Sequence, residues 1–145
     1  MKKIILSVAL AISAILTIGA QNKITVEVSG IDNPTGNLYV ALYDSKNVFL
    51  TNDAVAGKII GIEGNTVNVV FEAPEDGQYA LAIFQDENKN GKLDLGEYGI
   101  PTEKYGFSNN ADPVKLMRPP LFDECKFTVT GDTSVAISLA SATKK

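Results

Sequence analysis

The chain of 145 residues contains no histidine and no tryptophan. Without histidine, it lacks the base of Ser-His-Asp and Cys-His catalytic sites and the imidazole ligands of histidine-containing zinc and copper sites. Without tryptophan, it lacks a residue that is frequent at binding hot spots. These absences exclude a large part of enzyme chemistry and leave carboxylate and amide oxygens as the main candidate functional groups.

Cysteine is scarce as well, because Cys125 is the only one in the sequence. A single cysteine cannot form an intramolecular disulfide. Its neighbours Asp123 and Glu124 are acidic, which raises rather than lowers the pKa of a thiol and disfavours a reactive nucleophile. We therefore predict that Cys125 is a structural residue of a strand.

Only one long apolar run occurs, at residues 4–18, between two lysines and a small-residue end at Ala20. This arrangement is typical of a secretory signal peptide. The run is shorter than the roughly 20 apolar residues that span a bilayer, and no cysteine stands at the junction to be acylated. We predict a signal peptide over residues 1–20 and one exported domain, periplasmic or extracellular, over residues 21–145.

The charge balance is acidic, with 13 basic and 17 acidic residues and a net charge of −4. The predicted signal peptide holds two of the lysines and no acid, which leaves a net charge of −6 on the remaining chain. An acidic domain without a basic stretch argues against nucleic acid or an anionic membrane as a partner.

Apolar residues recur with period two along most of the chain, which predicts half-buried strands, and turn residues separate these runs. No segment after residue 20 has the capped periodicity of a long helix. The strands are expected at residues 23–30, 37–43, 57–62, 65–72, 77–85, 121–130 and 133–140.

This spacing predicts an all-β fold, an antiparallel β-sandwich of about seven strands. Residues 74–83, PEDGQYALAI, resemble a strand entry of transthyretin-like and related sandwich domains, so the sandwich is expected to be immunoglobulin/transthyretin-like. The long segment 86–120 interrupts the strand pattern and is predicted to be a loop insertion, a kind of segment that often carries function.

The insertion opens with the strongest chemical signal in the chain, a twelve-residue match to the calcium loop D-x-[DN]-x-[DN]-G-x₅-E. Gly91 at position six permits the required turn, and Leu93 at position eight is an apolar anchor. The predicted metal ligands are the side chains at positions one, three, five, nine and twelve and the backbone carbonyl at position seven: Asp86, Asn88, Asn90, Asp94, Glu97 and Lys92.

Calcium prefers six to eight oxygen ligands, and a cation relieves the mutual repulsion of three neighbouring carboxylates. The alternative is a solvated polar loop in which Asn90-Gly91 makes a hairpin turn. The residues before the loop predict a strand, so the site differs from a helix–loop–helix EF-hand. We expect Ca²⁺ as the cofactor, with a dissociation constant on the order of 10⁻⁴–10⁻³ M and an ordering role.

The second half of the insertion carries three aromatic residues, Tyr98, Tyr105 and Phe107. Two interpretations remain open. They form an aromatic surface for a ligand, or they form a small satellite core that holds the long loop on the sheet, which is the more frequent arrangement.

Several motifs together resemble the DUF2141 family of exported bacterial proteins. They are GQYA at 77–80, DENKNGKLD at 86–94, GIPTEKYGFSN at 99–109, and PPLFD at 119–123 followed by Lys126-Phe127. The resemblance implies a small secreted β-sandwich, and it implies no reaction, because the family has no assigned activity. The chain departs from the family pattern at Gln85, where relatives commonly have histidine, and at Cys125, usually alanine.

Two classes of function follow. The first is an exported, non-enzymatic binding or accessory module with a calcium-stabilised loop, whose partner is an envelope protein or glycan. The second is a small hydrolase acting on envelope glycan or peptide through Asp94, Glu97 or Glu103, since a carboxylate hydrolase needs two acids across a cleft. Acids bound to calcium do not serve as proton donors, and a small sandwich offers little cleft. We therefore expect the binding module.

Overall fold

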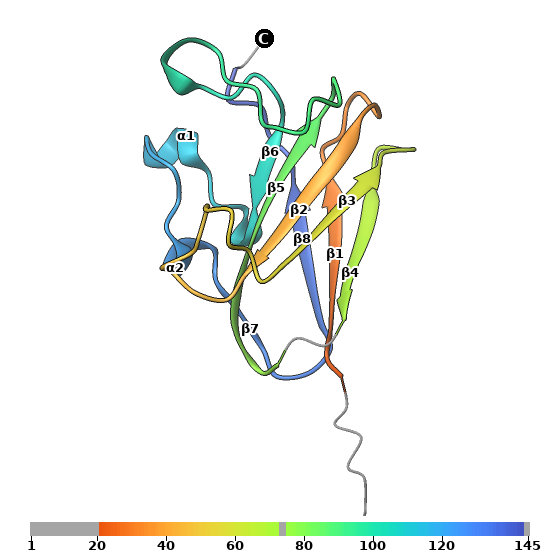
Figure 1. Cartoon of the computed structure of the whole chain (residues 1–145), viewed down its shortest axis with the longest axis vertical. Helices are drawn as coiled ribbons and strands as arrows, with labels where there is room; N and C mark the ends of the chain where they lie inside the picture. Colours follow the sequence, from red (N-terminus) through yellow and green to blue (C-terminus); the bar gives the residue numbers. More distant parts are fainter. Residues whose placement is uncertain (1–20, 73–74, 144–145) are drawn as a thin grey trace, which may run out of the picture.

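Two β-sheets pack face to face over residues 21–72 and 75–143, the part of the chain that the computed structural model describes (Figure 1). The predicted signal peptide, residues 1–20, lies outside the described residues. The eight strands are β1 (Lys23–Ser29), β2 (Asn37–Tyr43), β3 (Ala56–Gly61), β4 (Val67–Glu72), β5 (Gly77–Asp86), β6 (Tyr105–Phe107), β7 (Phe127–Val129) and β8 (Thr133–Ser138).

The smaller sheet has the order β4-β1-β8, and the larger has the order β3-β2-β5-β6 with β7 also paired to β5. β6 and β7 share one edge of β5, where β6 pairs with residues 82–84 and β7 with residues 77–79. The predicted all-β sandwich is therefore confirmed. One pairing departs from the antiparallel expectation, because β1 and β8 run parallel.

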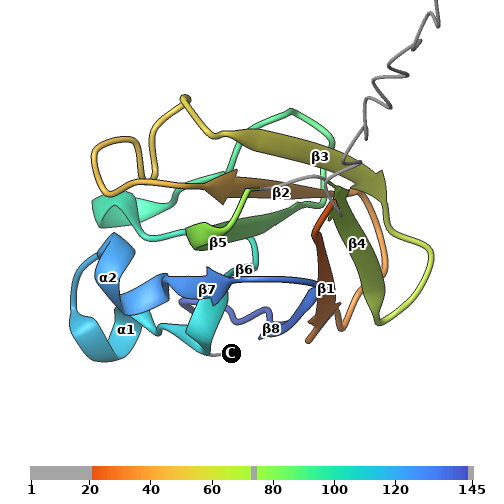
Figure 2. The same cartoon turned by 90° about the horizontal axis from the view of Figure 1, so that it is seen from below.

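The core lies between the sheets and follows from the period-two pattern. On β2, Leu38, Val40 and Leu42 are buried against the partner sheet, whereas Tyr39 and Ala41 face outward. Each buried aliphatic side chain of this kind stabilises the fold by roughly 1.5–3 kcal/mol. Figure 2 shows the two sheets edge-on, with the short helices beside the larger sheet and away from β1 and β4.

β6 also ties the two sheets together. The backbone N–H of Tyr105 donates to the carbonyl of Ala140 at 3.1 Å, and the N–H of Ala140 donates back at 2.9 Å. Between these strands a Cβ on Gly106 would lie 2.8 Å from Ile137 Cγ2, so the absence of a side chain permits the close approach. The insertion is thus fixed at its centre to the end of β8 and to the residues that follow it.

The insertion holds more structure than the sequence predicted. Besides β6, it contains two 3₁₀ turns and one short helix: η1 (Glu97–Gly99), η2 (Ser108–Asn110) and α1 (Pro113–Leu116). The carboxylate of Asp112 caps α1 by accepting from the N–H of Val114 at 2.9 Å. Among the described residues, no helix is long and apolar enough to cross a membrane.

The prediction of one strand over residues 121–130 is wrong in its first half. A helical turn, α2 (Phe122–Cys125), occupies it, and the Glu124 carboxylate accepts from the Leu121 N–H at 2.8 Å. Cys125 therefore lies in α2 and not in a strand. Its structural role is confirmed, because the side chain is fully buried with Tyr43, Phe122 and Ala80 in a second apolar cluster.

Candidate functional site

The loop predicted to bind calcium begins at Asp86, the last residue of β5, whose side chain is fully buried. One carboxylate oxygen accepts from the N–H of Asn90 at 3.1 Å, and the other accepts from the N–H of Gly91 at 2.8 Å. Gly91 has a φ of 82°, so the chain turns sharply at the position where the sequence predicted it. Asp86 therefore anchors the first half of the loop from inside.

Asn88, Asn90 and Asp94 form a polar network above Asp86. The side-chain amides of both asparagines donate to the Asp94 carboxylate, and the Asn90 bond measures 2.8 Å. The asparagine oxygens accept from the backbone, Asn88 from the N–H of Asn90 and Asn90 from the N–H of Lys92, both at 3.1 Å. Hydrogen bonds from Asn90 and Asn88 hold the pKa of Asp94 below its ordinary value.

Glu103 bridges two points of the loop, residues 87 and 94. Its Oε1 accepts from the N–H of Glu87 at 2.9 Å, and its Oε2 accepts from the N–H of Asp94 at 3.0 Å. The side chain is buried. Sequence reasoning considered Glu103 only as a hydrolase acid and missed this role. No local spacing pattern reports this role, because its partners lie 16 and 9 residues away along the chain.

Glu97 stands apart from this network. Residues 94–102 form a small hairpin closed by a Leu95–Pro101 bridge, with the Gly96 N–H donating to the Ile100 carbonyl at 2.7 Å. Glu97 begins η1 at the tip of this hairpin, where its side chain is exposed. Among the described residues, none of the hydrogen bonds of the loop network involves the Glu97 side chain.

Over residues 21–72 and 75–143, no three His, Cys, Asp or Glu side chains form a group that could hold a metal ion. The predicted ligand set contains three such side chains, Asp86, Asp94 and Glu97, and they do not form such a group; its other oxygens come from two asparagines and one carbonyl. The structure brings Asp86, Asn88, Asn90 and Asp94 into one network and places the Lys92 backbone in it. Calcium binding at these residues stays a prediction.

Gln85, which precedes Asp86 on β5, points to the face of the sheet opposite to that of Asp86. Its amide nitrogen donates to the carbonyls of Asn33 at 2.7 Å and Thr35 at 3.0 Å. Gln85 is fully buried and its Oε1 has no hydrogen-bond partner within the described part of the chain. The side chain therefore fastens the turn before β2 rather than facing the loop network.

A groove lies on the outer face of the larger sheet, next to the loop. Strand register explains its floor. Ile59, Tyr39, Phe84 and Tyr105 are neighbours across β3, β2, β5 and β6 and form a bulky row, in which the Tyr39 and Phe84 rings stack at 4.8 Å. The next row is small at its centre, because it consists of Gly57, Ala41 and Ala82 before Phe107.

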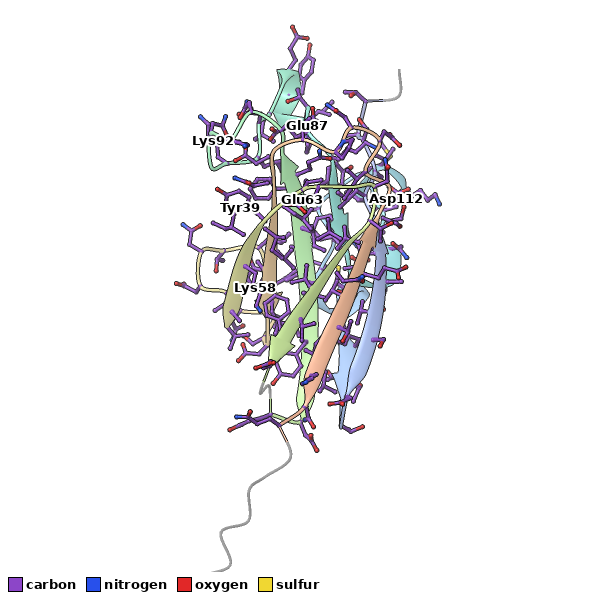
Figure 3. The ribbon with its side chains drawn as sticks, turned by 90° about the vertical axis from the view of Figure 1, so that its right-hand side faces the viewer. Tyr39, Lys58, Glu63, Glu87, Lys92 and Asp112 are labelled. Atoms are coloured by element: carbon purple, nitrogen blue, oxygen red, sulfur yellow. The ribbon has the colours of Figure 1, made fainter. Side chains whose placement is uncertain are left out.

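Beyond this row of small residues, the second apolar cluster covers the sheet again through Tyr43, Phe49 and Phe122. The row therefore forms a trough between two raised regions. The resulting groove has a volume of about 1350 Å³. In Figure 3, Lys92 of the loop lies above Tyr39, and Lys58 lies lower on the same side of the molecule.

The groove gathers the exposed apolar side chains of the protein. Nine large hydrophobic side chains are exposed among the described residues, and all except Val55 and Leu121 line the groove. The seven that line it are Leu50, Ile59, Leu95, Tyr98, Ile100, Val114 and Met117. Clustering of this kind marks an interaction site, whereas single exposed apolar residues do not.

For the three aromatic residues of the insertion, an aromatic surface and a satellite core were both open interpretations, and the structure divides the residues between them. Tyr105 is buried and lies 5.9 Å from Phe107, ring to ring, so both belong to the satellite core. Tyr98 is 96% exposed at the rim of the groove and belongs to a surface.

The family described as "Uncharacterized protein conserved in bacteria (DUF2141)" matches residues 26–138, which include all eight strands except the start of β1. The chain belongs to the DUF2141 family. The loop 86–97, Glu103 and the groove floor all lie within the part that DUF2141 covers. No curated protein matches the chain.

Among solved structures, this DUF2141 protein is similar to the crystal structure of a fimbrial assembly protein from Parabacteroides distasonis. The sequences are 12% identical and the TM-score is 0.42. The match covers 83% of this chain and 52% of the other, so the chain spans about half the length of the structure it matches.

Proposed function

We propose that this DUF2141 protein is an exported, non-enzymatic binding module whose loop 86–97 is ordered by calcium. The observation that carries the proposal is the convergence of the Asp86, Asn88, Asn90 and Asp94 side chains in one hydrogen-bonded network. The same loop forms a wall of the apolar groove through Lys92, Leu93 and Leu95. Ordering of the loop therefore fixes a wall of the binding surface.

The proposed ligands are the side-chain oxygens of Asp86, Asn88, Asn90, Asp94 and Glu97 and the backbone carbonyl of Lys92. For calcium to bind, the asparagine amides must exchange their bonds to Asp94 for coordination through oxygen. The hairpin tip must also bring Glu97 toward the network. Hard oxygen ligands of this type and number suit calcium and not softer metals.

The non-enzymatic assignment is supported by the hydrogen bonds of two of the three candidate acids, Glu103 and Asp94. Both oxygens of Glu103 hold backbone N–H groups, and Asp94 holds two amides. A general acid or nucleophile needs a free oxygen directed at substrate. The hydrolase alternative therefore receives no support from the arrangement of these two carboxylates.

Calorimetric titration of the exported, chelator-treated protein with Ca²⁺ tests the proposal. We expect one site with a dissociation constant on the order of 10⁻⁴–10⁻³ M. Saturation at about 100 times the dissociation constant adds about 2.7 kcal/mol to the free energy of unfolding. Asp94→Ala is expected to abolish the heat, and Asp53→Ala, which removes an exposed carboxylate outside the loop, is expected to leave it unchanged.

Absence of heat at millimolar calcium, together with a melting temperature that does not respond to chelator, would exclude the calcium site. Export is tested separately by amino-terminal sequencing of the protein recovered outside the cytoplasm. We expect the sequence to begin at Gln21, and a chain that retains residues 1–20 would exclude the predicted cleavage.

A further inference from the structure

The groove offers an apolar ligand almost no uncharged polar partners. Apart from tyrosine hydroxyls, Thr51 and Asn52 are the uncharged polar side chains that line it. The backbone at the centre of the floor is already paired, because β2 lies between β3 and β5, and β5 lies between β2 and β6; the outer edge of β3 is the open edge on this side. An extended peptide laid in the trough would bury backbone groups without partners, which is unfavourable. An alkyl chain has no such groups.

Three bulky apolar residues at the rim of the groove have a left-handed backbone conformation, which such residues rarely adopt. Leu50, Tyr98 and Met117 have φ values of 61°, 59° and 57°. Their side chains are 41%, 96% and 90% exposed, and all three line the groove. Left-handed backbone costs a non-glycine residue on the order of 1 kcal/mol and concentrates at ligand clamps. The protein therefore holds three apolar side chains in solvent around one hollow.

The charged residues that line the groove are all basic, although the protein is acidic overall: Lys58, Lys92 and Arg118. Lys58 pairs with Val40, so its side chain lies on the core-facing side of β3 and not on the groove face. Arg118 is paired with both oxygens of Glu124, and the Lys58 ammonium lies 5.7 Å from the centre of the Phe71 ring. Lys92 forms no ion pair among the described residues. It is the cation available to an anionic group at the loop end of the groove.

We propose that the groove binds a long-chain carboxylate, that is, a free fatty acid. The alkyl chain lies along the trough of Gly57, Ala41 and Ala82, the rim residues close over it, and Lys92 attracts the carboxylate. This inference names the ligand class of the binding module proposed above and rests on that proposal, but it does not require calcium. Calcium bound in the adjacent loop would add positive charge near Lys92 and strengthen binding.

Fluorescence titration of the exported protein with dansyl-labelled undecanoate tests the inference. We expect saturable binding at micromolar concentrations, displacement by oleate, and displacement by oleyl alcohol that is at least about threefold weaker, because the alcohol has no charge. Ala82→Phe fills the trough and is expected to weaken oleate at least tenfold. Ala136→Phe makes the same change on an exposed residue of β8, outside the groove, and is expected to leave affinity unchanged.

Two further pairs of variants lie outside the strands, so they test the inference without a substitution that could disturb the folding of the sheet. Lys92→Glu is expected to weaken oleate about 3- to 10-fold, whereas Lys89→Glu, in the same loop but outside the groove, leaves affinity unchanged. Met117→Ser is expected to weaken oleate, and Leu121→Ser, an exposed apolar residue outside the groove, is the matched control. Circular dichroism confirms that each variant is folded.

The inference is overturned if no saturable binding occurs below about 100 µM, or if Ala82→Phe and Ala136→Phe behave alike. It is also overturned if the protein sediments with phosphatidylglycerol vesicles but does not bind free oleate, since a lipid surface is then the occupant. Oleate binding without calcium binding removes only the calcium part of the proposed function. Calcium binding without oleate binding removes only this inference.

Discussion

The Oε2 atom of Glu103 accepts a hydrogen bond from the backbone N–H of Asp94 at 3.0 Å, while Oε1 accepts from the backbone N–H of Glu87 at 2.9 Å. One buried carboxylate thus bridges residues 87 and 94 of the loop. We predict that Glu103→Gln lowers the free energy of unfolding by about 1–3 kcal/mol, because a side-chain N–H₂ group replaces one acceptor. Urea denaturation in the presence of chelator measures the change.

Glu97→Gln is the control for this prediction. Its side chain lies outside the loop network, so the variant is expected to keep the stability of the calcium-free protein and to weaken calcium binding. Equal stability of Glu103→Gln and the native protein would show that the two hydrogen bonds of Glu103 contribute nothing to the free energy of unfolding.

Gly36 packs tightly against the backbone of Asp86, where the loop begins. Its φ is 78°, and a Cβ at this position would lie 2.0 Å from the carbonyl oxygen of Asp86. Gly36→Ala is therefore expected to cost about 2 kcal/mol or more in the free energy of unfolding. Gly64→Ala, where a Cβ meets no atom within 4 Å, is expected to change it by less than about 0.5 kcal/mol. Similar losses in both variants would contradict the close approach.

The thiol of Cys125 is predicted to be inert in the folded protein. Burial, with a smaller contribution from Glu124, raises its pKa to about 12, and the side chain is fully buried in the second apolar cluster. We expect no reaction with an aromatic disulfide reagent at pH 8 until denaturant unfolds the chain, and then one thiol per molecule. Rapid labelling of the native protein would contradict this account.

Glu124 is predicted to make the stability of the fold depend on pH in the acid range. Its hydrogen bonds with Arg118 and with the Leu121 N–H lower its pKa to about 2 from an ordinary 4.5. Because the folded-state pKa is lowered, the stabilisation is present above about pH 4.5 and is lost as the pH falls toward 2. Glu124→Gln is expected to flatten the dependence of stability on pH in this window.

The control is Glu63→Gln, which removes an exposed carboxylate that forms no ion pair among the described residues. It is expected to leave the pH dependence of unfolding unchanged. A Glu124→Gln variant with the same pH profile as the native protein would show that the pair with Arg118 does not respond to acid.

Much of the sandwich could be predicted because its long strands each bury one face. The alternation around Val26, Val40 and Ile83 is direct evidence of that burial. The short β6 could not be predicted, because three residues carry no period and the strand is defined by its contacts with β5 and β8. The helical turn at Cys125 was missed for a related reason, since its apolar residues face a second cluster and not the main core.

The loop could be predicted from the sequence and the groove could not, for the same reason. Ligand spacing in the loop is local, so the sequence predicted the turn at Gly91, while the binding of a metal ion by the loop stays a prediction. The groove depends on register between Gly57, Ala41 and Ala82, which come from three strands, and no local pattern reports it. Tyr98 and Met117 become recognisable as a rim only once the strands place them beside the same hollow.

Tyrosine-sensitised terbium luminescence tests the calcium loop most directly. Tb³⁺ occupies calcium sites, and the Tyr39 hydroxyl lies 3.5 Å from the position that a Cβ on Gly91 would take. We predict green emission on excitation of tyrosine, loss of that emission when Ca²⁺ is added in large excess over its dissociation constant, and weaker emission from Tyr39→Phe with calcium affinity unchanged. Absence of sensitised emission, or emission that calcium does not displace, would contradict the proposed site.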